Sequence, residues 1–235
     1  MIYSSLIIFN MLDIYSVNTN KFLSDLPYFK SLLSPDELDK IQRFKNKLQG
    51  DRTCIGRAKL RIILSSYLNI NPDKIVFNYN KKGKPFLRDY PNLHFNLSHT
   101  DHWIVYGISN QLIGVDIENI SKQVKFKQLA KRFFCPSEFQ LIEQVNQENK
   151  AKLFYTLWTA KEAYLKATGE GLSGGLDAIE LSYNFLSEDI EIISENTRTE
   201  WQIKNLKIDN NYLVSVAVKS KNKLPNKLIL KEVKK

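Results

Sequence analysis

The sequence predicts an α+β protein built from two similar units, and two observations lead to this expectation. Of the 235 residues, 43% are hydrophobic, which is enough to form a sizeable core in one large domain or two small ones. In each half of the chain, helix-like stretches come before short strand-like segments. Because this order occurs twice, we expect an N-terminal unit at residues 1–119 and a C-terminal unit at residues 120–235.

The N-terminal unit begins with a predicted buried strand at Ser5–Leu12. A helix is expected to start at Ser34, where Glu37 completes a capping box. A second helix is expected over Asp51–Tyr67, because its apolar residues recur at roughly helical spacing. Strand-like segments and one turn follow. The strands are Lys74–Tyr79, Leu93–Leu97, Trp103–Ile108 and Ile113–Ile117, and the turn is Lys81–Pro85.

The C-terminal unit repeats this order of helices before strands. Its predicted helices are Phe126–Phe134, Ser137–Val145 and Lys150–Thr168, and its strands lie near Ile179, near Ile190, and over Trp201–Leu206 and Tyr212–Val218. The segment Gly169–Gly174 matches a dinucleotide-binding fingerprint by letter, but it ends a helix instead of opening one, so we expect a helix cap and a turn. The lysine-rich tail after Lys219 is expected to be frayed or disordered.

Composition excludes several classes of protein. No apolar run approaches the roughly 20 residues needed to span a bilayer, and the first residues do not form a convincing signal peptide, so we expect a cytoplasmic protein with no membrane partner. The two cysteines, Cys54 and Cys135, lack metal-ligand spacing and are expected to be packing residues. The net charge of +9 indicates an acidic partner, which leaves nucleic acid, a phosphate-rich cofactor and an acidic protein surface open.

Two acids close one of the predicted strands, in the segment Gly114–Glu118. Alternate residues of a strand share a face, so Asp116 and Glu118 are expected to point the same way while Val115 and Ile117 are buried. Two adjacent carboxylates repel each other unless a cation lies between them. Such hard oxygen ligands suit magnesium, although solvated acids at an exposed strand end have the same spacing.

A second pattern lies on the last predicted helix. Phe154, Trp158, Glu162 and Lys166 are spaced four residues apart, so an acid and a base continue an apolar row. By itself this is also the pattern of an ordinary surface ion pair. Together with Asp116, Glu162 is a candidate ligand to a shared metal, with Lys166 facing a phosphate.

The strand that contains Phe95–His99 delivers two polar residues at its end. Phe95 and Leu97 alternate with polar residues, so one face is expected to be buried, and Ser98 and His99 follow. Adjacent residues on a strand point apart, which argues against a Ser–His hydrolase pair and favours a phosphate contact from His99. The same alternation separates His94 from His99 and argues against a zinc site.

Several motifs occur together in a distinctive order. They are Phe95-Asn-Leu-Ser-His99, Gly114-Val-Asp-Ile-Glu118, Arg132-Phe-Phe134 with Glu138, and Trp158-Thr-Ala-Lys-Glu-Ala-Tyr-Leu-Lys166 followed by Gly169-Glu-Gly-Leu-Ser173. In order and spacing these stretches resemble the surfactin-synthetase type of 4'-phosphopantetheinyl transferase. The resemblance implies two α/β subdomains related by a pseudo-twofold axis, with coenzyme A held in the cleft between them.

The resemblance also implies roles for individual residues. Asp116, Glu118 and Glu162 would bind magnesium, with manganese as the alternative ion, beside the pyrophosphate of coenzyme A. The implied contacts to the cofactor itself come from Arg52, Lys84, Ser98, His99, Lys40 and Lys166. Among these, Arg52 and His99 would hold phosphates, whereas Lys84 and the region of Ser98 would face adenosine.

The implied reaction is an in-line phosphoryl transfer to a serine of an acyl or peptidyl carrier protein, with release of adenosine 3',5'-bisphosphate. Glu162, or Glu118 through a water, would take the serine proton, and Lys166 would neutralise the leaving group. Basic charge suits the acidic surface that carrier proteins usually have. Two units in one chain lead us to expect a monomer, and the sequence leaves open the pathway that the carrier protein serves.

Three alternatives follow from the residues alone. Net charge and the aromatic residues beside lysines in Phe77–Phe86 suit a basic nucleic-acid-binding protein, although that function gives Asp116 and Glu118 no role. Carboxylates with a lysine also suit a metal-dependent nuclease. A non-catalytic scaffold leaves both acid motifs unexplained. We therefore expect an enzyme that acts on coenzyme A and expect no nucleic-acid partner.

Overall fold

The structure of the chain, a computed structural model, describes residues 11–122, 124–171, 175–177, 179–193, 200–221, 223–225 and 228–233. In chain order its first elements are β1 (Leu12–Asn18), a 3₁₀ helix (Thr19–Asp25), α1 (Leu26–Ser31), α2 (Pro35–Gln42), α3 (Lys47–Leu68), a second 3₁₀ turn (Pro72–Lys74), β2 (Asn78–Tyr79), β3 (Pro85–Phe86), β4 (His94–Thr100) and β5 (Trp103–Ser109). The elements that follow are β6 (Ile113–Asn119), α4 (Phe126–Phe133), α5 (Pro136–Gln144), α6 (Gln147–Thr168), β7 (Leu181–Tyr183), β8 (Ile190–Ile192), β9 (Trp201–Lys207), β10 (Tyr212–Lys219) and β11 (Leu230–Glu232).

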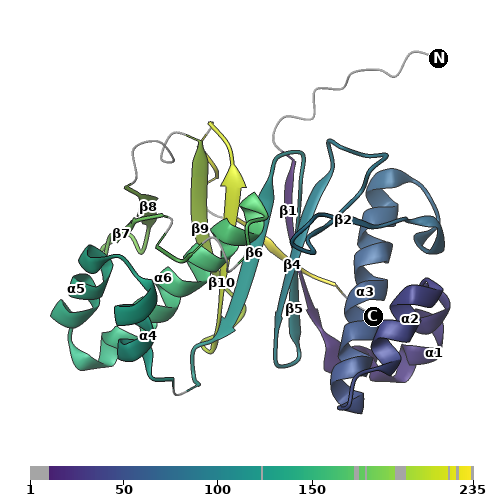
Figure 1. Cartoon of the computed structure of the whole chain (residues 1–235), viewed down its shortest axis with the longest axis horizontal. Coiled ribbons are helices and arrows are strands. Elements are labelled where there is room, and N and C mark those ends of the chain that lie inside the picture. The colour runs from purple at the N-terminus through teal and green to yellow at the C-terminus, as the bar shows by residue number, and fades with distance from the viewer. Residues whose placement is uncertain are drawn as a thin grey trace.

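Two sheets, each accompanied by one long helix, form the body of the molecule. A four-stranded sheet has the order β11-β1-β5-β4, and a three-stranded sheet has the order β6-β10-β9. Figure 1 shows α3 on the outer side of the first sheet and α6 beside the second, with β4 and β6 near the junction of the two halves. The α+β architecture of two units is therefore confirmed.

Side chains, and not a backbone ladder, connect the two sheets where β4 meets β6. Asn96 Oδ1 accepts a hydrogen bond from the main-chain N–H of Val115 at 2.9 Å, and Ser98 Oγ donates to Asp116 Oδ1 at 2.8 Å. The polar residues of the two strands thus face each other across the junction. The site described below forms at this seam.

Helix α3 begins earlier than the sequence pattern predicts. Its N-cap is Asn46, whose side chain accepts a hydrogen bond from the N–H of Gln49, and its C-cap Asn69 has a left-handed conformation with φ of 53°. The prediction began at Asp51 because the apolar spacing starts there, whereas the capping side chain sets the helix start four residues earlier.

Helix α6 packs against β6 at unusually close range. A Cβ atom added to Gly114 would lie 2.0 Å from the carbonyl oxygen of Ala163 and 2.4 Å from the main-chain nitrogen of Ala167. Only glycine leaves room for the helix backbone at this distance. The helix ends where the sequence predicted, with Gly169 as its left-handed C-cap at φ of 81°.

Two predicted segments differ from the structure. The strand expected over Ser5–Leu12 lies mostly outside the described residues, and the first described strand is β1. The strand expected over Lys74–Tyr79 is wrong in its first half, where Pro72 starts a 3₁₀ turn and only the last two residues pair. The turn expected after it is confirmed as a hairpin between β2 and β3, with Gly83 at φ of 82°.

The expectation of a frayed tail after Lys219 is wrong for Leu230–Glu232, which form β11, while residues 222, 226–227 and 234–235 lie outside the described part of the chain. β11 pairs in parallel with β1, and the buried Leu224 and Leu228 lead into it. Two of the charges near this end form ion pairs, Lys231 with Asp13 and Lys21 with Glu232. Lysine content alone misled the prediction because these partners are distant in sequence.

The division at residue 120 stays a prediction, and the pairing of strands crosses it twice. β6, from the first unit, pairs with β10, and β11, from the second, pairs with β1. Within the described part of the chain, no helix has both the length and the apolar character needed to cross a membrane.

Candidate active site

Asp116 is the centre of the candidate site. β6 buries Val115 and Ile117 on one face, as expected, and presents Asp116 and Glu118 on the other. The Asp116 side chain is almost fully buried, and its Oδ1 atom accepts hydrogen bonds from Ser98 and from Lys166 Nζ, the latter at 2.6 Å. Its Oδ2 atom is buried and has no hydrogen-bond partner among the described residues.

Three elements converge on this carboxylate. β6 supplies Asp116, β4 supplies Ser98, and the last turn of α6 supplies Lys166. Lys166 Nζ also donates to Ser98 Oγ at 2.8 Å, so the three side chains form a closed triangle of contacts. Ser98 and Lys166, which are separated by 68 positions in the chain, therefore meet directly. The sequence placed Asp116 at a metal and Lys166 at a phosphate, and the contact between these two side chains was not predicted.

Glu118 and Glu162 flank the triangle and titrate abnormally. Burial and, after it, the negative charge of Asp116 together raise the pKa of Glu118 to about 7. Glu162 has a pKa of about 7 for the same two reasons, with Lys166 opposing them in both cases. The effect of Asp116 on both groups means that three carboxyl groups lie close enough to repel one another.

This set of donors fits a hard divalent cation. The oxygen ligands are those that Mg²⁺ prefers, and the buried, unpartnered Oδ2 of Asp116 is a free acceptor within it. In the arrangement described, no group of three Asp, Glu, His or Cys side chains lies at metal-ligand spacing, and Lys166 is the cation bound to Asp116. The repulsion among the three carboxyl groups favours a metal here, whereas the distances between their oxygens are not yet those of a metal site.

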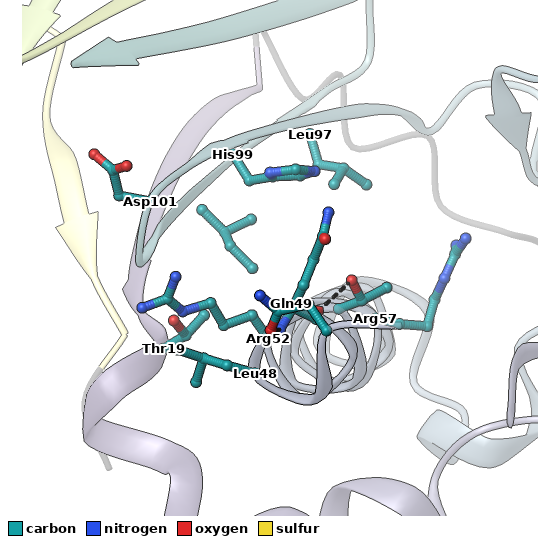
Figure 2. A pocket seen from close by; sticks show the side chains of 12 residues that line it. Thr19, Leu48, Gln49, Arg52, Arg57, Leu97, His99 and Asp101 are labelled. Carbon is teal, nitrogen blue, oxygen red and sulfur yellow. Dashed lines mark hydrogen bonds between the residues drawn. The ribbon is translucent and has the colours of Figure 1, made fainter. Parts of the chain in front are cut away.

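A pocket of about 410 Å³ adjoins the site on the side of α3. Figure 2 shows His99 on one wall, at the end of β4, and Arg52 on the opposite wall, from α3. Burial and the nearby charge of Lys166 lower the pKa of His99, with Asp116 opposing them, so this imidazole is neutral at pH 7. Arg57 also lines the pocket, and the sequence reasoning missed it because the opposite wall comes from β4 and β5, which are distant from α3 in the sequence.

Lys84 and Lys40 lie elsewhere. Lys84 Nζ donates to the carbonyl oxygens of Ala167 at 2.8 Å and Ile113 at 3.4 Å, and burial lowers its pKa to about 8. It lines a second pocket of about 380 Å³ that also contains His94, so His94 and His99 face different cavities. Lys40 is exposed and lies over the Tyr79 ring, 4.9 Å from its centroid.

The lysine inside the Trp158–Lys166 motif serves the fold. Lys161 is fully buried, and its ammonium pairs with Glu138 at 2.8 Å and donates to the carbonyl oxygens of Leu176 and Ile179. Glu138 also accepts main-chain hydrogen bonds from the start of α5 and from β7. This pair joins α5, α6 and β7. The sequence alone does not show that Lys161 has a structural role whereas the neighbouring Glu162 lies at the site.

Comparison with known proteins places this arrangement in a family. A model described as "4'-phosphopantetheinyl transferase, N-terminal" matches residues 22–111, and one described as "4'-phosphopantetheinyl transferase superfamily" matches residues 112–217. The 4'-phosphopantetheinyl transferase HetI of Nostoc sp. is 37% identical over 199 residues, covering 83% of this chain and 82% of that protein. The 4'-phosphopantetheinyl transferase Sfp of Bacillus subtilis is 31% identical over 209 residues, covering 87% of this chain and 91% of that protein.

One solved structure is a more distant match. A holo-(acyl-carrier-protein) synthase from Bacillus anthracis matches 46% of this chain and 93% of its own, with a TM-score of 0.36 and 16% identity. The family models and the curated relatives, in contrast, span most of the chain, including all three elements of the triangle around Asp116. The resemblance seen in the motifs is confirmed, and the chain belongs to the 4'-phosphopantetheinyl transferase family.

Proposed function

We propose that this enzyme transfers the 4'-phosphopantetheine group of coenzyme A to a serine of an apo acyl or peptidyl carrier protein, assisted by Mg²⁺ or Mn²⁺. The family supplies the reaction. The observation that carries the assignment of residues is the triangle of Ser98, Asp116 and Lys166, flanked by two carboxyl groups whose pKa values are raised to about 7.

Asp116, Glu118 and Glu162 are the residues that would hold the metal. When bound, a divalent cation supplies neutralisation of phosphate charge and fixes the orientation of the phosphates. The crowded carboxylates and the unpartnered Oδ2 of Asp116 support this assignment. A cation placed among the three carboxylates would reduce their mutual repulsion and give Oδ2 a partner.

The chain's own groups move the proton and balance the charge. The carrier serine oxygen forms a bond to the phosphorus that bears pantetheine, and the bond from that phosphorus to the adenosine bisphosphate oxygen breaks. Glu162, or Glu118 through a water, takes the serine proton. Lys166 donates to the leaving phosphate and compensates the negative charge that develops there.

The pocket beside α3 suits the phosphates of coenzyme A. Arg52 presents a guanidinium group to it, and His99 presents a neutral imidazole that can donate one N–H. We assign Lys84 and the region of Ser98 to the adenosine end, and Lys40 to an outlying phosphate contact from the exposed surface.

The proposed partner is a carrier protein with an acidic surface, and the net charge of +9 supports that complementarity. We further propose that the enzyme acts as a monomer, since both halves of the site come from one chain. We propose the cytoplasm as the place where it acts.

The intact mass of an apo carrier protein tests the reaction directly. After incubation with the enzyme, coenzyme A and Mg²⁺, the carrier should gain about 340 Da, the mass of a phosphopantetheine arm transferred by metal-assisted chemistry, and excess chelator should prevent the gain. Carriers of fatty acid, polyketide and peptide synthesis should each be tried. A gain that persists in chelator would refute the metal requirement, and no gain together with nicking of plasmid DNA would favour a nuclease.

The substitution Asp116→Ala tests the centre of the site. We expect a loss of transfer rate of at least about 10³-fold with a circular dichroism spectrum like that of the wild type, because one residue serves both the metal and Lys166. Asp73→Ala is the matched control, since Asp73 is an exposed aspartate paired only to the adjacent Lys74 among its described contacts. Full activity in Asp116→Ala would exclude the proposed centre.

A further inference from the structure

A buried pair of hydroxyl groups joins α6 to the second sheet. Thr159 Oγ1 and Ser215 Oγ lie 2.7 Å apart, and both residues are fully buried. Ser215 also donates to Asn205 Oδ1 at 2.7 Å, and Thr159 contacts the carbonyl oxygen of Tyr155 at 2.9 Å. A series of polar contacts therefore runs from Asn205 on β9 through Ser215 on β10 to Thr159 on the buried face of α6.

The two hydroxyls have two protons between them. Ser215 directs its proton to Asn205, so the single proton of Thr159 is shared between the carbonyl oxygen of Tyr155 and Ser215 Oγ. Sliding α6 along the sheet breaks the contact between the two hydroxyls and is penalised by that loss, while Thr159 keeps its hydrogen bond to Tyr155 and Ser215 keeps its hydrogen bond to Asn205. An apolar pair of the same volume would tolerate such a slide far better.

The chain of hydroxyls is anchored next to the active site. Ser215 on β10 pairs in register with Asp116 on β6, and residues opposite each other in an antiparallel pair have side chains on the same face. Glu162 follows Thr159 by three residues, which places it on the same side of α6 in the next turn. The contact thus holds the helix at the point of the sheet where Asp116 stands.

Two local features together fix where α6 lies. Gly114 sets how closely the helix approaches β6, since its missing side chain admits the backbone at Ala163. Close contact with glycine does not fix the position of the helix along the strand, because no side chain interlocks there. The directional contact between Thr159 and Ser215 fixes the position of the helix along the strand.

We propose that Thr159 and Ser215 are positioning residues that hold Glu162 at the distance from Asp116 that the reaction requires. The proposal rests on the proposed role of Glu162 as base and metal ligand. Neither hydroxyl touches the reacting groups, so both act through α6. Catalytic side chains must be held to within about 0.5 Å of their working positions, which makes a small slide of the helix costly to the rate.

The substitution Thr159→Val removes the hydroxyl and keeps the shape of the side chain. We expect kcat to fall about tenfold, because misplacement by less than 1 Å has effects of this order, while KM for coenzyme A changes less than about twofold. Affinity for Mn²⁺, measured by electron paramagnetic resonance without coenzyme A, should fall about fivefold, since Glu162 is one of the proposed ligands. Thr159→Ser should restore both values to within about twofold of the wild type, because it restores the hydroxyl.

Thr156→Val is the matched control. Thr156 lies one turn earlier on the same helix and is 3% exposed, and its contribution to the series of polar contacts is a main-chain carbonyl at 3.3 Å from Thr159 Oγ1. This control should leave kcat and the affinity for Mn²⁺ unchanged. The effects of Thr159→Val and Ser215→Ala on kcat should be non-additive, because either change breaks the same contact.

Three results would overturn the proposal: equal effects of Thr159→Val and Thr156→Val on kcat and on Mn²⁺ binding, additive effects in the double variant, or failure of Thr159→Ser to rescue. Failure of the proposed function gives a different pattern. A wild-type enzyme that binds no Mn²⁺ refutes the metal assignment, and the kcat comparison still tests positioning. A wild-type protein without transferase activity refutes the function, and the comparison of Mn²⁺ affinities remains.

Discussion

The two oxygens of Asp116 have different surroundings, and this difference organises the site. Oδ1 accepts from Ser98 and Lys166, whereas Oδ2 is buried without a partner among the described residues. A carboxylate divided in this way can keep its protein contacts on one side and accept a cation on the other. The two glutamates respond to its charge through their pKa values, so the three acids behave as one electrostatic unit.

The variants Glu118→Gln and Glu162→Gln should each stabilise the metal-free protein at pH 8 by about 1 kcal/mol, a value reduced to allow for partial exposure. The pKa of each group is raised from 4.5 to about 7, so the folded state holds more protons than the unfolded state between these values. The free energy of unfolding therefore falls as pH rises through this window, and an amide avoids that loss.

Urea denaturation in chelator at pH 5 and pH 8 measures the effect. Stability of the wild type should decrease between the two values by more than that of either variant. Equal pH dependence in the wild type and both variants would contradict the raised pKa values. Transfer activity should fall in both variants regardless, which separates the role in stability from the role in catalysis.

At this scale the sequence predicts chemical identity better than spatial arrangement. The carboxylates, Ser98 and Lys166 were all anticipated, because their spacing on strands and helices places each on a definite face. Arg57 was missed because the other wall of its pocket comes from strands that are distant from α3 in the sequence. Lys84 shows the same limit, since its hydrogen bonds to the end of α6 depend on the fold.

Helix α6 packs closely against β6 at Gly114, and the substitution Gly114→Ala should destabilise the protein by disturbing this contact. The added Cβ would fall 2.0 Å from the carbonyl oxygen of Ala163, so helix or strand must move. We expect a loss of about 3 kcal/mol in the free energy of unfolding, at the upper end of overpacking effects. Gly50→Ala in α3 is the control, with its nearest contact at 3.3 Å, and should change stability by less than about 1 kcal/mol. Equal effects, measured by chemical denaturation, would contradict the close approach.

The buried pair of Lys161 and Glu138 joins α6 to its neighbours, and Lys161→Met should break it. An unpaired buried carboxylate costs about 3 kcal/mol, which thermal and urea unfolding would reveal. Lys152→Met removes an exposed pair on the same helix and should cost less than about 1 kcal/mol. Activity per folded molecule should be largely retained, because Lys161 faces away from the site. A complete loss of activity in a folded Lys161→Met enzyme would assign the motif lysine to catalysis.

Long periodic elements were predictable and short ones were not. The three helices of the C-terminal half match their predicted ranges closely, because the apolar residues of each pack into one hydrophobic cluster. β2 and β3 have two residues each, too few to show an alternating pattern. β11 was missed since its pairing partner lies more than 200 residues away in the chain, and no local signal reports it.

For the whole molecule, net charge should govern the encounter with the carrier protein. At carrier concentrations well below saturation, raising NaCl from about 50 to about 500 mM should lower the transfer rate about tenfold, because opposite fields are screened. The rate at saturating carrier should change less. The mass-based transfer assay at both salt concentrations makes the measurement, and an unchanged rate at low carrier concentration would argue against an acidic partner surface.

The pairing of β11 with β1 has a consequence for synthesis of the protein. The first strand of the four-stranded sheet emerges from the ribosome early, whereas its parallel partner is among the last segments described. The four-stranded sheet is therefore incomplete until β11 has been translated, after every other described element of the chain. Termination of translation before β11 would leave β1 with an open edge, so an error late in this chain affects a sheet whose other strands were made much earlier.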